Sequence, residues 1–278
     1  MRLSALASIS LLLVSCCFAA EKRNLVELTT KLGVHATVVV GKVSHPDWLL
    51  DRHASGWSTA SFLLKLNPNV YLGIPIWLLD RVERQGTGHR LILVNGRELR
   101  GALECTLQSH ENEKLYDLRT VDRLVRLEYD DRDSSMARTH RKASTRWKLK
   151  LTEPLALPQD VCNPYFSFRY WSSEGYVVGG SDEFEESSEA FYLRTGGEEV
   201  TVNLSDFASV TLTTVGPKLT ARLVSASGVT TTGAAILRAK DPEARPPMSF
   251  DFAMYDLDGL EIILKSPNCT LTQIAAGN

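Results

Sequence analysis

The sequence predicts an all-β protein built from two related halves. Apolar side chains alternate with polar ones in short segments that are rich in β-branched and aromatic residues, such as residues 201–204 and 250–254, and residues 91–94 form a further strand-like run. This period of two is typical of strands with one buried face. A succession of motifs that occurs twice along the chain is the second observation, and it predicts the two halves.

The repeated motif with the clearest layout is a β-hairpin, predicted at residues 90–103 and again at 221–236. Each segment has a strand-like run, a two-residue turn ending in glycine, and a second strand-like run with another glycine five residues further on. The turns and second glycines are Asn95-Gly96 with Gly101 and Ser227-Gly228 with Gly233. Asn-Gly favours such a turn because both positions tolerate positive φ.

A triplet of apolar residues, spaced three apart, precedes and follows each hairpin. The four triplets are Ile76/Leu79/Val82, Leu118/Val121/Leu124, Leu204/Phe207/Val210 and Leu257/Leu260/Ile263. Spacing of three predicts a single 3₁₀ or α turn, in which such positions share a face. We expect four nearby aspartates to cap these turns: Asp80, Asp122, Asp206 and Asp258.

The match extends faintly toward the N-terminus of each half. Residues 61–65 correspond to 190–194, and residues 38–41 are matched to 176–179. The predicted organisation is a signal peptide at 1–20, an N-terminal β domain at 21–130, a polar linker or long loop at 131–147, and a C-terminal β domain at 148–278 that duplicates the first. The acidic segment 182–186 is expected to be a solvated loop.

The order of strand, hairpin, strand, helical turn and final strand resembles an SH3-like or Sm-like small β-barrel. The resemblance covers residues 74–130 and 200–266. The layout is also similar to repeats in exported bacterial proteins of unknown function. This resemblance implies a fold of two homologous SH3-like barrel units and assigns no catalytic residue, because small barrels carry many unrelated functions.

The first twenty residues predict export. Arg2 precedes an apolar stretch, residues 5–14, that is short for a membrane span. Two processing routes remain open: cleavage after Ala19 as in an ordinary signal peptide, or lipidation of Cys16, which ends a segment resembling a bacterial lipobox. Either route predicts an extracytoplasmic location, namely the periplasm, an outer-membrane lipoprotein or a secreted protein.

Charge and cysteine content narrow the function classes. The chain has 31 Lys+Arg against 33 Asp+Glu, a net charge of -2, which argues against a nucleic-acid partner bound mainly through phosphates. Cys105, Cys162 and Cys269 lie outside the signal. An oxidising compartment favours one disulfide among them, with the pairing open.

Two segments are candidate sites. His45, Asp47, Asp51 and His53 combine imidazoles with carboxylates, as divalent metal sites do, although their spacing matches no zinc signature and a surface loop is the alternative. An aromatic run at 165–176 is the other. Its candidate ligand-binding residues are Arg169, Tyr170, Trp171 and Tyr176, and a core strand with one buried face is the alternative.

We therefore expect a non-catalytic binding or scaffold protein of the bacterial cell envelope. Its expected partner is an envelope protein or a glycan, with no cofactor and with membrane attachment only through a lipid on Cys16. Two alternatives remain: a metal-dependent hydrolase that uses residues 45–53, and a carbohydrate-binding protein that uses residues 165–176.

Overall fold

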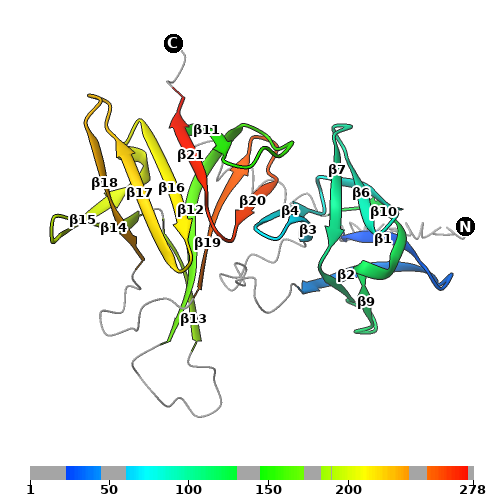
Figure 1. Ribbon diagram of the computed structural model, residues 1–278. Helices are drawn as coiled ribbons and strands as arrows, with labels where there is room; N and C mark the ends of the chain where they lie inside the picture. The colour runs from blue at the N-terminus through cyan, green and yellow to red at the C-terminus, as the bar shows by residue number, and fades with distance from the viewer. Residues whose placement is uncertain are drawn as a thin grey trace, which may run out of the picture.

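The computed structural model describes residues 23–44, 61–129, 145–171, 183–188, 190–237 and 249–274, with backbone alone at 168–171, 183–188 and 249. These residues form antiparallel strands and two three-residue 3₁₀ turns, so the predicted all-β class is confirmed (Figure 1). No helix in this part of the chain is long and apolar enough to span a membrane.

The strands divide into a first half, residues 25–128, and a second half, residues 146–273. The first half contains β1 (Leu25–Thr30), β2 (His35–Ser44), β3 (Ser61–Asn67), β4 (Val70–Pro75), β5 (Leu79–Gln85), β6 (Gly88–Leu93), β7 (Glu98–Leu103), β8 (Thr106–Ser109), β9 (Leu115–Asp117), η1 (Leu118–Thr120) and β10 (Val121–Glu128). The second contains β11 (Arg146–Leu151), β12 (Asp160–Trp171), β13 (Glu183–Ser188), β14 (Ala190–Thr195), β15 (Glu198–Asn203), η2 (Leu204–Asp206), β16 (Ser209–Val215), β17 (Lys218–Val224), β18 (Thr230–Ile236), β19 (Ser249–Asp256), β20 (Glu261–Leu264) and β21 (Cys269–Gln273).

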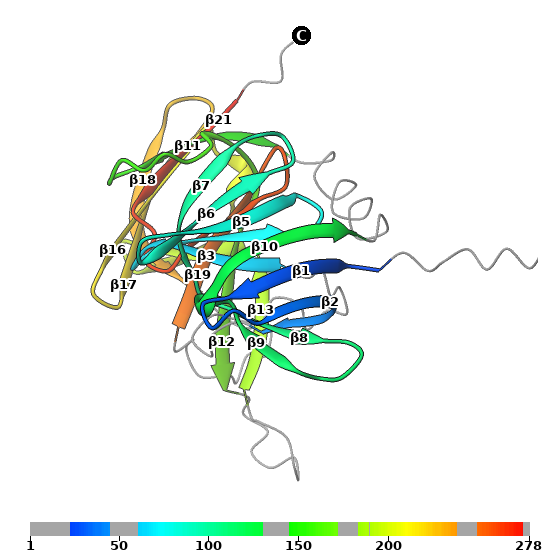
Figure 2. The ribbon, with the colours of Figure 1, turned by 90° about the vertical axis from the view of Figure 1, so that its right-hand side faces the viewer.

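Hydrogen bonding arranges the strands in one linear series. Through the first half the order is β9-β8-β2-β1-β10-β5-β6-β7-β3-β4, and Figure 2 shows β7, β6, β5, β10, β1 and β2 following one another. β4 then pairs with β20, and the series continues as β20-β19-β12-β11-β21-β16-β17-β18-β14-β15. Among the described strands the series is therefore open, with β9 and β15 at its two ends, and β13 branches from β12.

The two halves use the same pairings, strand for strand. When β1 and β2 are replaced by β11 and β12, and β3 to β10 by β14 to β21, every pairing within the first half becomes a pairing within the second. β13 has no counterpart among the described strands of the first half and extends β12 into a longer hairpin. The β4–β20 pairing joins the two halves to each other.

The two glycines that follow the predicted hairpin turns occupy equivalent places where strands cross closely. A Cβ added at Gly101 would lie 2.3 Å from the carbonyl oxygen of Lys65, and one added at Gly233 would lie 2.3 Å from that of Arg194. Both distances are far below van der Waals contact. Glycine is therefore required for β7 to approach β3 and for β18 to approach β14.

Register corrects two of the predicted matches between the halves. Leu124 lies opposite Val82 and Leu271 lies opposite Val210, so the counterpart of β10 is β21. The predicted triplet at 257–263 does not lie in β21. It lies in the β19–β20 turn and in β20, one strand before β21. Residue 38 of β2 corresponds to residue 161 of β12 and not to residue 176. Residue 38 lies opposite the same position of β1 as residue 161 does of β11. Chance triplets are common in a chain so rich in apolar residues, and spacing alone could not exclude this one.

Two segments expected to be loops contain strand residues. β11 begins at Arg146, inside the predicted linker, and the side chain of Trp147 is 1% exposed in the core. The acidic segment at 182–186 lies largely in β13, where residues 183–188 pair with the aromatic end of β12. Cross-strand pairing with β-prone aromatic residues overrides the low strand propensity of glutamate here.

Of the two helical turns that the structure describes, one has an aspartate cap, and this aspartate is not one of those predicted. The carboxylate of Asp117 accepts the backbone N–H of Arg119 at 3.0 Å, at the start of η1. The aspartates expected to cap make other contacts: Asp80 with Arg81, Asp122 with Arg84, Asp206 with Asn203 and Asp258 with Asn95. A cap must directly precede its turn, and these four lie within or after theirs.

Apolar side chains of both halves form one hydrophobic cluster. Its largest fully buried members are Trp147, Phe62, Phe166, Phe191 and Phe252. The cluster continues across the junction, where Leu72 on β4 and Ile262 on β20 are both 0% exposed and lie opposite each other. The junction is thus a packed interior and not a hinge between separate cores.

Candidate functional site

The β12–β13 hairpin projects from the sheet and carries part of the predicted aromatic site (Figure 1). β13 lies in the segment of chain that connects β12 to β14. The corresponding segment of the first half connects β2 to β3 and contains residues 45–60, where the predicted metal site lies. The two segments that the sequence singled out as sites therefore occupy equivalent positions along the two halves.

The candidate ligand-binding residues lie at the tip of this hairpin. Arg169, Tyr170 and Trp171 are the last three residues of β12, and their backbones pair with residues 183–185 of β13. Tyr176 lies outside the described residues. The register places Glu185 opposite Arg169.

The beginning of the aromatic run belongs to the core. Phe166 is 0% exposed, and its ring centroid lies 4.7 Å from Phe252, 5.6 Å from Phe191 and 6.4 Å from Phe250. Edge-to-face and tilted contacts of this kind stabilise buried aromatic clusters. For Phe166 the alternative of a core strand is therefore correct.

Tyr165 faces the junction between the halves. Its hydroxyl donates a hydrogen bond to Oε1 of Glu261, and its ring stacks on Tyr255 with centroids 6.1 Å apart. Glu261 is only 9% exposed and lies opposite Gly73 of β4. Tyr165 therefore satisfies a nearly buried carboxylate, as a buried polar group requires.

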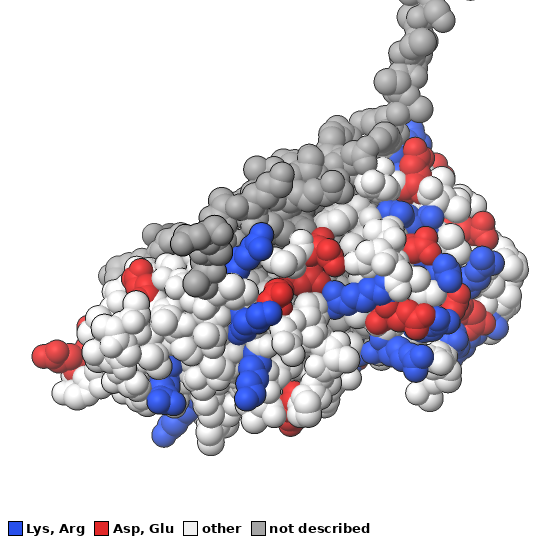
Figure 3. Space-filling view, turned by 90° about the horizontal axis from the view of Figure 1, so that it is seen from above, with Lys and Arg blue, Asp and Glu red and all other residues white. Residues whose placement is uncertain are grey.

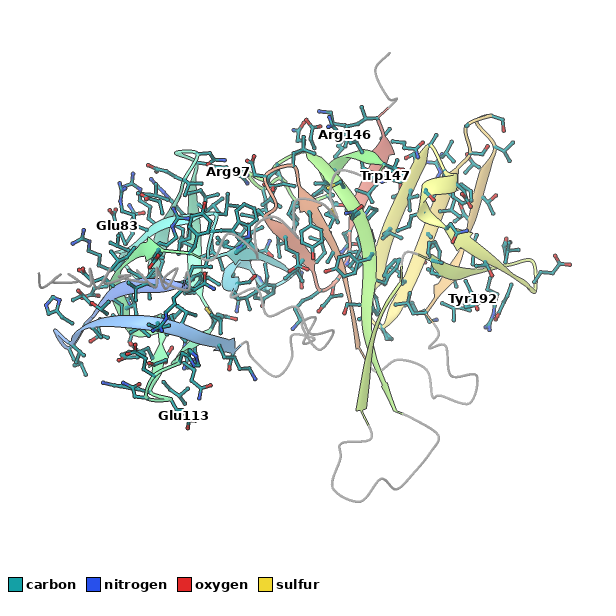
Figure 4. The ribbon with its side chains drawn as sticks, turned by 180° about the vertical axis from the view of Figure 1, so that it is seen from behind. Glu83, Arg97, Glu113, Arg146, Trp147 and Tyr192 are labelled. Atoms are coloured by element: carbon teal, nitrogen blue, oxygen red, sulfur yellow. The ribbon has the colours of Figure 1, made fainter. Side chains whose placement is uncertain are left out.

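Asp256 is the most heavily used polar side chain of the junction, and sequence reasoning missed it. It is 2% exposed, and its carboxylate accepts the N–H groups of Gly259 and Leu260 at 2.6 and 2.7 Å and Nη1 of Arg97 at 2.8 Å. Figure 4 shows Arg97 at the boundary between the halves. The available signal was an aspartate three residues before a glycine, here with φ of 102°, which is typical of an Asx-stabilised turn.

Ion pairs cover much of the outer face of the first half. Arg90 contacts Glu83 at 3.3 Å and also Glu98, and Arg81 contacts Glu83 at 3.0 Å. Figure 3 shows basic and acidic side chains interspersed over this half. Exposed pairs of this kind contribute little stability each, and their mixed signs give no extended basic field for phosphates.

The candidate metal ligands His45, Asp47, Asp51 and His53, and the candidate lipidation residue Cys16, lie outside the described residues. Within the ranges that the structure describes, no group of three or more His, Cys, Asp or Glu side chains is placed to hold a metal ion.

Cys105, Cys162 and Cys269 are buried thiols, and the expected disulfide is absent from this structure. Cys162 lies opposite Arg146 and Cys269 opposite Leu151, five positions apart along β11. That separation is about 16 Å at the usual rise of a strand, whereas a disulfide needs α-carbons within about 7 Å. Burial raises the pKa of both Cys105 and Cys269 to about 12, so neither is a reactive thiolate.

His89 is a buried structural histidine. It is 3% exposed, Nε2 lies 3.1 Å from the carbonyl oxygen of Val121, and Nδ1 accepts the N–H of Leu103 at 3.3 Å. This bonding pattern fits the neutral ring with its proton on Nε2. Burial lowers the pKa of His89 below its usual 6.5.

This histidine predicts a loss of stability in mild acid. Below pH 6.5 the unfolded chain binds a proton that the folded chain excludes, so stability is complete above that pH and falls as pH drops toward the lowered folded pKa. Urea unfolding at about pH 7.5 and about pH 5.5 should show this fall in the native chain, and a smaller one in His89→Gln. The exposed His110→Gln variant is the control and should keep the native pH dependence.

Comparison of the chain with family models, curated proteins and solved structures gives no significant match.

Proposed function

We propose that this chain is an exported, non-catalytic scaffold of the bacterial cell envelope that binds other proteins by strand pairing at the edges of its sheet. The observation that carries the proposal is the serial order of the described strands, in which β9 and β15 each have one unpaired edge. An edge strand presents a row of backbone N–H and C=O groups to which an extended partner can add.

The proposal includes an origin by duplication, with two homologous units that resemble small SH3-like barrels. Three observations support it: the pairings match strand for strand, the hairpin turns have glycines of similar φ (81° at Gly96 and 84° at Gly228), and Gly101 and Gly233 meet the same backbone obstacle. Similar composition alone would not give equivalent clashes at both crossings.

The β12–β13 hairpin supplies a second binding element in this proposal. Within the described part of the chain, β13 pairs with β12 alone, so its other edge is open to a partner. The backbone of Arg169, Tyr170 and Trp171 lies one strand in from that edge, paired with the opposite side of β13. Aromatic and arginine side chains are the types most often found at the centres of protein interfaces, and aromatic rings also stack on sugars.

Export and lipid attachment are carried by the N-terminal sequence. We expect full-length protein produced in bacteria to incorporate labelled palmitate and to fractionate with the envelope, and Cys16→Ser to lose the label. Export with no label in the native chain would favour cleavage after Ala19 and a soluble envelope protein. Retention of native chain in the cytoplasm would overturn the proposed location.

Metal analysis separates the scaffold from the hydrolase alternative. The scaffold proposal expects no stoichiometric transition metal in protein purified from the envelope. A bound metal that is lost in a His45→Ala, His53→Ala double variant would overturn it and assign catalysis to residues 45–53. Tryptophan fluorescence titrated with cell-wall glycans tests the carbohydrate alternative, because binding at the hairpin tip should perturb Trp171 and the response should disappear in Trp171→Phe.

A further inference from the structure

We infer that copies of this chain assemble head to tail, with β15 of one copy adding to β9 of the next. This deepens the proposed function and rests on it, since it names a second copy of the chain as one partner of the sheet edges. The template for the contact is already present inside each molecule, where β4 of the first half pairs with β20 of the second.

The two end strands are the counterparts of the two strands that meet at this internal junction. β15 occupies in the second half the place of β4 in the first, because it pairs with β14 as β4 pairs with β3. β9 occupies the place of β20, because it pairs with β8 as β20 pairs with β19. Among the described strands, β15 pairs with β14 alone and β9 with β8 alone, so each has one unpaired edge. In their counterparts, β4 and β20, the corresponding edges pair with each other at the internal junction.

Register fixes which residues would meet. Val200 is the counterpart of Leu72, because they lie opposite the equivalent Leu193 and Leu64. Leu115 is the counterpart of Ile263, because they lie opposite equivalent positions of β8 and β19. The internal pairs are Ile262–Leu72 and Ile263–Tyr71. When each residue is replaced by its counterpart, Lys114 lies opposite Val200, and Leu115 lies opposite Glu199, of the neighbouring copy.

The contact would cover two exposed apolar side chains and bring opposite charges together diagonally. Leu115 is 63% exposed and Val200 is 52% exposed, and both are apolar side chains that pairing would cover. Lys114 would lie diagonally across from Glu198, on the same face of the extended sheet, and both side chains are exposed. A cation on β9 and a carboxylate on β15 at this spacing attract each other.

The contact would be heterologous, since it joins two different edges. A heterologous contact repeats from copy to copy and produces a ring if the rotation closes, or a filament if it does not. The step from one copy to the next would resemble the step from the first half to the second, so the assembly would be a continued series of like units.

The test is sedimentation velocity over a wide concentration range, with exported protein carrying Cys16→Ser so that no lipid contributes. We expect masses that rise with concentration through whole multiples of the mass of the exported chain. Lys114→Glu and Glu198→Lys should each weaken assembly about fivefold or more, because each places like charges across the contact. The exposed Lys218→Glu, in the β16–β17 hairpin away from both edges, is the matched control and should assemble normally.

Mixing the two variants gives the sharper result. The carboxylate introduced by Lys114→Glu in one variant would meet the ammonium introduced by Glu198→Lys in the other, so an equimolar mixture should assemble more strongly than either variant alone. Unchanged circular dichroism spectra would confirm that both variants fold. A native chain that is monomeric throughout, or assembly that both variants leave intact, would overturn the inference. Neither outcome bears on palmitate labelling or envelope fractionation, which test the proposed function separately.

Discussion

Replacement of Asp256 by alanine is expected to destabilise the protein by about 3–5 kcal/mol, the usual loss when one partner of a buried ion pair is removed. The carboxylate is 2% exposed and accepts two backbone N–H groups and one guanidinium N–H. The variant leaves the Arg97 charge without its carboxylate and removes the acceptor that holds the β19–β20 turn. Urea unfolding followed by tryptophan fluorescence measures the loss.

The matched control for this prediction is Asp258→Ala. Asp258 lies in the same turn and also contacts the first half, through Nδ2 of Asn95 at 2.8 Å, but at an exposed site. Its removal should cost less than about 1 kcal/mol, since exposed polar contacts contribute little. Equal losses for the two variants would show that burial of Asp256 does not stabilise the junction.

Gly101→Ala and Gly233→Ala are each expected to destabilise by about 3 kcal/mol, the upper part of the usual range for overpacking. In most strand positions alanine is no worse than glycine, so the ordinary expectation is a neutral or favourable change. Here the added Cβ would lie 2.3 Å from a carbonyl oxygen of the adjacent strand in both halves. The β3–β7 and β14–β18 pairings must separate to admit it, and thermal unfolding should detect the loss.

Thr232→Ala controls for a general effect of substitution on β18, because Thr232 is exposed and directly precedes Gly233. It should change stability by less than about 0.5 kcal/mol. Similar losses for Gly101→Ala and Gly233→Ala would support the equivalence of the halves. A large loss at only one of the two glycines would contradict that equivalence.

The sequence predicted the features that depend on local patterns. The strand-like segments at 91–94, 201–204 and 250–254 fall largely in β6, β15 and β19, and the turns at Gly96 and Gly228 are confirmed as glycines with positive φ. The match of residues 61–65 with 190–194 also agrees with the strand pairing, since both segments form the strand crossed by the hairpin. These signals can be read from the sequence because alternate residues of one strand share the same face of the same sheet.

The predicted caps failed for a local reason, whereas other predictions failed because residues distant in the sequence decide which strands pair. The triplet at 257–263 has the right spacing, yet the strand that pairs with β16 is β21, because register with β11 and β16 selects it. The acidic segment at 182–186 reads as a loop until its partner strand β12 is known. No local rule could place Asp256 against Arg97, since these residues are separated by most of the chain.

The all-β class, the two hairpins and the glycines that recur in both halves could be read from the residues alone, because each follows from side-chain periodicity or from backbone conformation. The three-dimensional fold was needed to show that the halves follow one another in a single sheet through β4 and β20, and that β9 and β15 lie at the ends of the described series. That choice depends on burial across the junction, where the opposed Leu72 and Ile262 are both fully buried. The free energy of burying them arises only when the two strands meet.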